Sequence, residues 1–91
     1  MRILVSLSDK NGIVDFINKL IIHYPELEII STSGTSKYLK ENNFNVIEVN
    51  EFTSFPEILD GRVKTLHPKI FGGILFKRNS LNHIKEIKKH N

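Results

Sequence analysis

The sequence predicts an α/β protein of three layers, α/β/α, with a mainly parallel sheet. Short apolar segments rich in branched residues, at 3–5, 27–30 and 46–49, alternate with longer segments whose apolar residues recur at helical spacing. This strand–helix–strand–helix–strand order is typical of two right-handed crossovers within one parallel sheet. At 91 residues, the chain has the length of one domain at most, residues 1–91.

The first two elements are predicted to be a buried strand and an amphipathic helix. The strand at 3–5 is short, apolar and followed by serines. Residues 8–12 have turn chemistry, and from Ile13 apolar residues recur at helical spacing with Asp15 in the first turn. We expect this helix to end before Pro25, because the residue before a proline is disfavoured in a helix.

A second strand is expected at 27–30 and a third at 46–49. The helix between them begins at 33–35, turns Leu39 inward and stops at 42–43, where two asparagines follow each other. These elements complete the alternation on which the fold class rests.

The last part of the chain is predicted to be less regular. Residues 50–72 form a long stretch interrupted by proline and glycine, and such loops inside a compact domain are usually functional. Residues 72–76 are expected to begin a further short strand. From residue 82 onward the isoleucines are again spaced as in a helix.

The composition excludes several classes of function. Without cysteine the chain forms no disulfide, thiolate nucleophile or zinc–thiolate site. No run approaches the roughly 18 apolar residues of a membrane span, and the N-terminus lacks the features of a signal peptide, so we expect a cytoplasmic protein that does not act at a membrane. His23, His83 and His90 have no partners at ligand spacing, and we therefore predict no metal site.

The charge is distributed unevenly along the chain. Residues 1–60 carry five Lys/Arg against nine Asp/Glu, a balance of −4, whereas residues 61–91 carry eight against one, a balance of +7. Such clustering attracts phosphate, nucleic acid or an acidic surface. We interpret the final lysines, at 85–89, as a solvated helix face.

Two polar clusters follow the first and second predicted strands. Ser6, Ser8 and Lys10 form one, and residues 31–35 form the other. Ligands of open parallel sheets bind beyond the carboxyl ends of the strands, and the start of a helix favours an anion. The two clusters therefore predict a phosphate site, although serine and threonine before a helix can also be ordinary N-caps, and Gly34 can serve a tight turn.

The third polar cluster lies at 61–69. Arg62 and Lys64 offer a planar fork and a mobile charge for phosphate, and Thr65 adds a hydroxyl. Gly61 lets the backbone come close to a ligand. The alternative is a solvated basic loop. His67 precedes a proline; it either transfers a proton or anchors the loop through a hydrogen bond, and the structural role is favoured.

Four segments of the chain resemble one family in the same order. The segment DGRVKTLHPKIFGGIL, residues 60–75, resembles the signature of the IMP cyclohydrolase domain of bifunctional purine biosynthesis proteins (AICAR transformylase/IMP cyclohydrolase). VSLSDKNG resembles the family's SVSDKTG, STSGT its STGGT, and FTSFPE its TGFPE. The resemblance covers residues 1–78 and implies the fold of the methylglyoxal-synthase-like superfamily, incomplete in this fragment.

The resemblance implies an enzyme of purine nucleotide biosynthesis that closes the ring of formyl-AICAR, giving IMP and water. It implies a purine nucleotide as the small-molecule partner, no nucleic acid, and a homodimer for the full-length protein. Ring closure in the family uses no cofactor. The 10-formyltetrahydrofolate of the transformylase step belongs to a C-terminal domain that is absent here.

The resemblance also assigns candidate site residues. Lys64 corresponds to a lysine that stabilises charge on the formyl oxygen; the alternative for Lys64 is a phosphate contact without a chemical role. His67 is a further candidate. The counterparts expected to bind the nucleotide are Ser8, Lys10, Thr32, Gly34, Thr35, Arg62 and Thr65.

The chain departs from the family pattern at two positions and in length. Ser33 replaces a glycine, which is unfavourable if the position needs a positive φ, and Phe71 replaces a histidine. The family's domain is about twice as long, so we interpret this chain as the N-terminal portion of one, without several active-site residues. Two other functions stay open: a regulatory phosphate-binding domain of the same superfamily, and a basic nucleic-acid-binding module.

Overall fold

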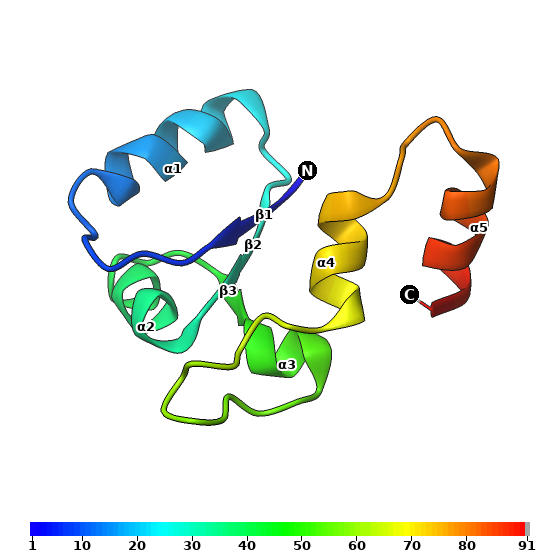
Figure 1. The fold of residues 1–91 in the computed structure, drawn as a ribbon. Coiled ribbons are helices and arrows are strands. Elements are labelled where there is room, and N and C mark those ends of the chain that lie inside the picture. The colour runs from blue at the N-terminus through cyan, green and yellow to red at the C-terminus, as the bar shows by residue number, and fades with distance from the viewer. Residues whose placement is uncertain (91) are drawn as a thin grey trace. The chain divides into compact units, whose positions relative to one another are not determined.

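The computed structural model describes residues 1–90, which belong to two compact units, Met1–Phe52 and a second unit that begins at Thr53 (Figure 1). The first unit contains strands β1 (Arg2–Val5), β2 (Glu28–Ser31) and β3 (Val46–Glu48) with helices α1 (Ile13–His23) and α2 (Ser33–Glu41). Helix α3 (Val49–Thr53) follows β3, and the second unit contains α4 (Pro68–Leu75) and α5 (Leu81–His90).

The described strands form one parallel sheet in the order β1-β2-β3. Its register places Ile3 beside Ile29 and Ile29 beside Val46. The predicted α/β class, parallel pairing and helix–strand alternation are therefore confirmed. The third strand is shorter than predicted, because Val49 is buried as the first residue of α3 and does not extend the strand.

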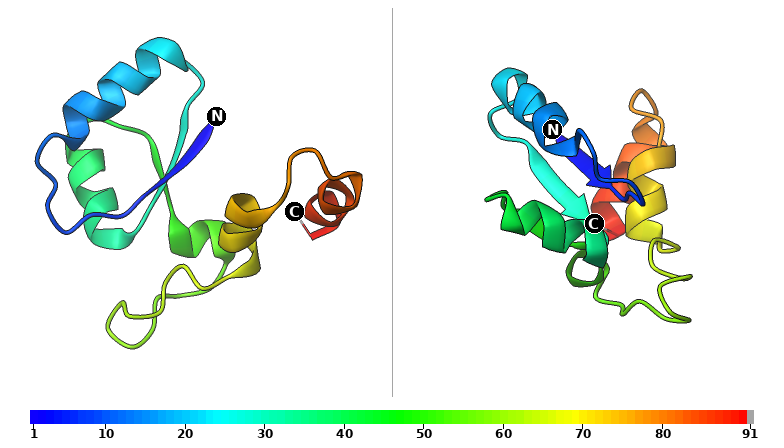
Figure 2. Two further views of the ribbon diagram at one scale, coloured as in Figure 1. Left: turned by 45° about the horizontal axis from the view of Figure 1, so that its top comes forward. Right: turned by 90° about the vertical axis from the view of Figure 1, so that its left-hand side faces the viewer.

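The core of the first unit lies on one face of this sheet. Val5 and Ile29 pack there with Ile17 of α1 and Leu39 of α2. Partly buried neighbours surround this core: Ile3, Ile13, Ile21, Leu27, Tyr38, Phe44 and Val46. Since side chains alternate along a strand and the register aligns Ile3, Ile29 and Val46, which all pack with this core, α1 and α2 cover the same face (Figure 2).

The two crossover helices end where their sequences predict. At the end of α1, the Tyr24 N–H bonds the Leu20 carbonyl, directly before Pro25. At the end of α2, Asn43 adopts φ +69° and the Phe44 N–H returns to the Leu39 carbonyl at 3.1 Å. This is a Schellman-type cap in which asparagine takes the left-handed position, and Phe44 joins Leu39 in the core.

The second unit corrects the prediction for residues 72–76. They form no strand, because α4 runs from Pro68 to Leu75 and proline at its first turn favours a helix start. A Cβ on Gly72 would lie 3.2 Å from Ile87 Cδ1, so this glycine lets α5 approach. The irregular stretch is also shorter than predicted, spanning 54–67. Among the described residues, no helix is long and apolar enough to cross a membrane.

Candidate functional site

The loops that follow β1 and β2 are hydrogen-bonded to each other at the carboxyl edge of the sheet. Thr32 Oγ1 lies 3.0 Å from Ser6 Oγ, and the Thr32 N–H bonds the Val5 carbonyl at 3.4 Å. Thr32 is the N-cap residue of α2, but its side chain makes no capping bond to that helix. The predicted proximity of the first two polar clusters is thus observed, through a contact between the loops themselves.

Thr35 fixes the backbone of the first loop. Its hydroxyl accepts from the Leu7 N–H at 3.1 Å and donates to the Leu7 carbonyl at 3.3 Å. Thr35 is only 2% exposed, so this hydroxyl is built into the protein. The two loops, residues 6–10 and 32–35, form one hydrogen-bonded rim, which we call the loop pair.

Lys10 and Ser8 are two polar members of the loop pair that reach solvent. Lys10 Nζ donates to the Leu7 carbonyl at 3.1 Å and keeps two further N–H groups. Ser8 is exposed. The Asn11 N–H bonds Asp9 Oδ1 at 2.9 Å, which tightens the turn that follows. Lys10 therefore supplies the positive charge beside the hydroxyls.

The start of α2 adds backbone donors to the loop pair. Gly34 is exposed, and a Cβ built there would meet nothing within 4 Å, so packing inside the chain does not require a glycine. Glycine in a helix is unfavourable by roughly 1 kcal/mol relative to alanine, and close approach of a ligand is a reason to keep it. Ser33 is the first residue of α2 and not at positive φ, so the serine is not strained there.

The third cluster begins with a tight reversal of the chain. Ile58 and Val63 exchange two backbone hydrogen bonds, and the Arg62 N–H bonds the Leu59 carbonyl at 3.1 Å. Asp60 and Gly61 have φ values of +56° and +77°. Asp-Gly suits a turn with two left-handed residues. Gly61 is thus explained by the turn itself, and close approach to a ligand is not needed to account for it.

Exposed cations follow this turn. Arg62 and Lys64 are both exposed, whereas Thr65 is half-buried. The His67 N–H bonds the Thr65 carbonyl at 2.8 Å, which bends the chain at Leu66. The segment thus presents a guanidinium and an ammonium to solvent two residues apart.

His67 ends the segment as the N-cap residue of α4. Its Nδ1 accepts from the Lys69 N–H at 3.1 Å, ahead of Pro68 at the first helical position. This is the anchoring hydrogen bond favoured by the sequence. It leaves Nε2 as the imidazole nitrogen available to a ligand.

The candidate residues thus fall into two groups. Ser8, Lys10, Thr32, Gly34 and Thr35 lie together in the first unit, and Arg62, Lys64, Thr65 and His67 follow one another in the second. Sequence reasoning noted Ser6 but did not make it a site residue, and it missed the Leu7 backbone as the point where three hydrogen bonds meet. Thr32 and Thr35 are buried, which the sequence does not show. Their buried hydroxyls are hydrogen-bonded to Ser6 and to the Leu7 backbone.

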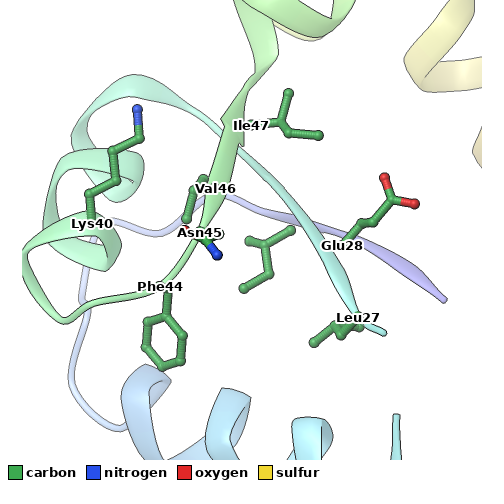
Figure 3. A pocket seen from close by; sticks show the side chains of 8 residues that line it. Leu27, Glu28, Lys40, Phe44, Asn45, Val46 and Ile47 are labelled. Carbon is green, nitrogen blue, oxygen red and sulfur yellow. The ribbon is translucent and has the colours of Figure 1, made fainter. Parts of the chain in front are cut away.

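A cavity of about 410 Å³ lies at the opposite end of the sheet from the loop pair (Figure 3). Its walls come from the amino ends of β2 and β3 and the end of α2: Leu27, Glu28, Ile29, Lys40, Phe44, Asn45, Val46 and Ile47. None of these is a predicted site residue, and Lys40 pairs with Glu48 at 3.9 Å. We therefore do not assign the nucleotide to this cavity. Within residues 1–90, no three His, Asp or Glu side chains lie close enough together to hold a metal ion.

Replacing Thr35 by valine is expected to lower the free energy of unfolding by about 1–3 kcal/mol, because the Leu7 N–H loses its buried acceptor. The Thr35→Ser variant keeps the hydroxyl and should retain most of the wild-type free energy of unfolding. Urea unfolding of both variants measures the effect. A valine variant of wild-type stability that bound a nucleotide less tightly would instead make Thr35 a direct ligand contact.

The chain belongs to the MGS-like domain family, whose model matches residues 12–91. It is 53% identical over 90 residues to the bifunctional purine biosynthesis protein PurH of Clostridium beijerinckii and 56% identical over 90 residues to PurH of Fusobacterium nucleatum, with 99% of this chain covered in each case. The chain spans 18% of the length of either relative. The family resemblance inferred from the four sequence blocks is confirmed.

A solved structure has the same fold. The crystal structure of ForH superimposes with a TM-score of 0.81 at 27% sequence identity, covering 98% of this chain and 45% of that chain. The α/β fold expected of this family is therefore confirmed at the level of the backbone.

Proposed function

We propose that this chain contributes part of the active site of an IMP cyclohydrolase, within a bifunctional enzyme of purine biosynthesis. The observation that carries the proposal is the loop pair: two loops at the carboxyl edge of a parallel sheet, hydrogen-bonded to each other, that present Lys10, exposed hydroxyls and the start of α2. Such an arrangement suits a phosphate. Similarity to PurH over nearly the whole chain supports a purine nucleotide as the ligand.

In the proposed reaction, the carboxamide nitrogen of formyl-AICAR attacks the formyl carbon of the same molecule, and the formyl oxygen leaves as water as the ring closes. Both reacting groups are on one substrate, so the protein has to orient it and stabilise charge. Lys64 is proposed to stabilise the negative charge that develops on the formyl oxygen. Its exposed position after the Asp60–Gly61 turn leaves the ammonium available. No oxidation takes place, and the proposal includes no cofactor for this step.

Five further candidates are proposed to bind the nucleotide. Ser8, Lys10 and the Gly34 backbone contact the phosphate, and Arg62 and Thr65 contact phosphate or ribose. His67 is proposed to hold the loop through its N-cap bond, since that bond already uses Nδ1. The transformylase activity with 10-formyltetrahydrofolate, and the homodimer, belong to the proposed intact protein.

Replacing Lys10 by alanine in the intact protein is expected to weaken IMP binding by about 1.5–3 kcal/mol, through loss of a charge-assisted hydrogen bond. The affinity for inosine, which lacks the phosphate, should change far less. Calorimetric titration with both ligands makes the comparison. Lys19→Ala removes an exposed lysine from α1 and should leave both affinities unchanged. Unaltered IMP affinity in Lys10→Ala would remove Lys10 from the site.

The same titration, together with a conversion assay and a gel shift, distinguishes the alternative functions. A regulatory phosphate-binding domain would bind the nucleotide without converting formyl-AICAR. A nucleic-acid-binding module would shift an oligonucleotide in a gel with strong salt dependence and would not bind IMP stoichiometrically. The nucleic-acid alternative is based on the excess of Lys and Arg over Asp and Glu in residues 61–91.

A further inference from the structure

The hydroxyls of the loop pair can be distinguished by where their hydrogens go. Thr32 is 3% exposed, and its hydroxyl has Ser6 Oγ as hydrogen-bond partner at 3.0 Å. A hydroxyl carries one hydrogen, and leaving a buried one without an acceptor is unfavourable by about 1–3 kcal/mol. Donation from Thr32 to Ser6 avoids this loss, whereas donation in the opposite direction would leave the Thr32 hydrogen buried without a partner.

Ser6 therefore keeps its own hydrogen for another acceptor. It is exposed and directly follows β1, at the carboxyl edge where Lys10 and the start of α2 also lie. A hydroxyl that accepts one hydrogen bond is polarised and donates a second one more strongly. Ser6 thus combines exposure, a fixed oxygen and an available donor.

Thr35 differs from Ser6 in this respect. Its single hydrogen is directed to the Leu7 carbonyl at 3.3 Å, and its oxygen accepts from the Leu7 N–H. An anion needs donors, and the Thr35 side chain has none left to offer. The anion-binding capacity of the loop pair therefore lies in its exposed serines and lysine and in the backbone of α2, with the two buried threonines in supporting positions.

We propose that Ser6 donates a hydrogen bond to the phosphate of the nucleotide, and that Thr32 is a positioning residue that acts through Ser6. This inference rests on the proposed nucleotide site and extends it by two roles. The structural observation behind it is the buried-to-exposed hydroxyl pair, Thr32 to Ser6, at the edge of the sheet.

A double-mutant cycle in the intact protein tests the proposal, with IMP, inosine and inorganic phosphate as ligands in calorimetry. Ser6→Ala is expected to weaken IMP and phosphate binding about 10- to 100-fold and to leave inosine nearly unchanged. Thr32→Val should weaken IMP binding less, about 3- to 10-fold, because Ser6 keeps its hydroxyl but loses its orientation. Since Thr32 acts through Ser6, the double variant should bind no more weakly than Ser6→Ala.

Thr32→Ser provides the conservative control, since it retains the hydroxyl and should restore IMP affinity. Thermal unfolding of each variant identifies a general loss of structure. The proposal is overturned if Ser6→Ala binds IMP as the wild type does, if the two losses multiply in the double variant, or if the wild type binds neither IMP nor phosphate. Binding that depends on Ser6 in a protein without ring-closing activity would contradict the proposed function and leave this inference intact.

Discussion

Replacing Lys64 by alanine in the intact protein is expected to lower kcat for ring closure by roughly 10²–10³, or about 3–4 kcal/mol, with little change in IMP affinity. Charge on the formyl oxygen grows only as the transition state is approached, so an ammonium placed there stabilises the transition state more than the substrate or product. The proposed phosphate contacts belong to other residues, in the loop pair and at Arg62 and Thr65. The loss should therefore appear in kcat.

Steady-state conversion of formyl-AICAR to IMP, run beside a binding assay for IMP, measures this effect. Lys85→Ala, which removes an exposed lysine from α5, is the matched control and should leave both kcat and KM unchanged. The transformylase step should also survive, because in the proposed intact protein it belongs to a separate domain. A tenfold rise in KM at constant kcat would show that Lys64 only binds the substrate.

Replacing Ile17 by alanine is expected to lower the free energy of unfolding by about 2–5 kcal/mol. Ile17 is fully buried and joins α1 to Val5, Ile29 and Leu39 in the core of the first unit. Its truncation leaves a cavity between helix and sheet and removes buried apolar surface. Ile22→Ala is the matched control on the same helix, because Ile22 is 75% exposed, and its effect should stay within about 0.5 kcal/mol.

Urea unfolding followed by circular dichroism compares the two isoleucine variants. Equal losses of stability at Ile17 and Ile22 would contradict the packing of α1 against the sheet. A large loss at Ile17 alone also predicts weaker nucleotide binding, because α1 and β1 hold the two ends of the loop that carries Ser8 and Lys10.

The first half of the fold could be predicted because its signals are local. The apolar spacing of α1, the proline after it and the asparagine pair after α2 act within a few residues, and the structure confirms each boundary. The second half could not, because Gly72 is explained by Ile87, fifteen positions along the chain. A glycine pair before an apolar run resembles the start of a strand until that helix–helix contact is known.

The candidate site was predictable in its residue types and less so in their roles. Parallel strands bring their carboxyl ends together, so Ser6 and Thr32 were expected on one edge, and their hydroxyls are 3.0 Å apart. The sequence does not show which hydroxyls are buried. The sequence predicts that Thr35 binds the nucleotide, and in the structure its hydroxyl hydrogen is directed to the Leu7 carbonyl. Similarly, Gly61 suggested ligand approach, whereas its φ of +77° belongs to a turn.

The conversion of formyl-AICAR to IMP by the intact wild-type protein tests the central claim most directly. Product is followed by chromatography at substrate concentrations up to saturation, against the uncatalysed reaction. The proposed function predicts IMP formation well above that background, with a rate that falls in Lys64→Ala and an affinity that falls in Lys10→Ala. Tight binding of IMP by a protein that forms no IMP from formyl-AICAR would contradict the claim and leave a nucleotide-binding domain without ring-closing activity.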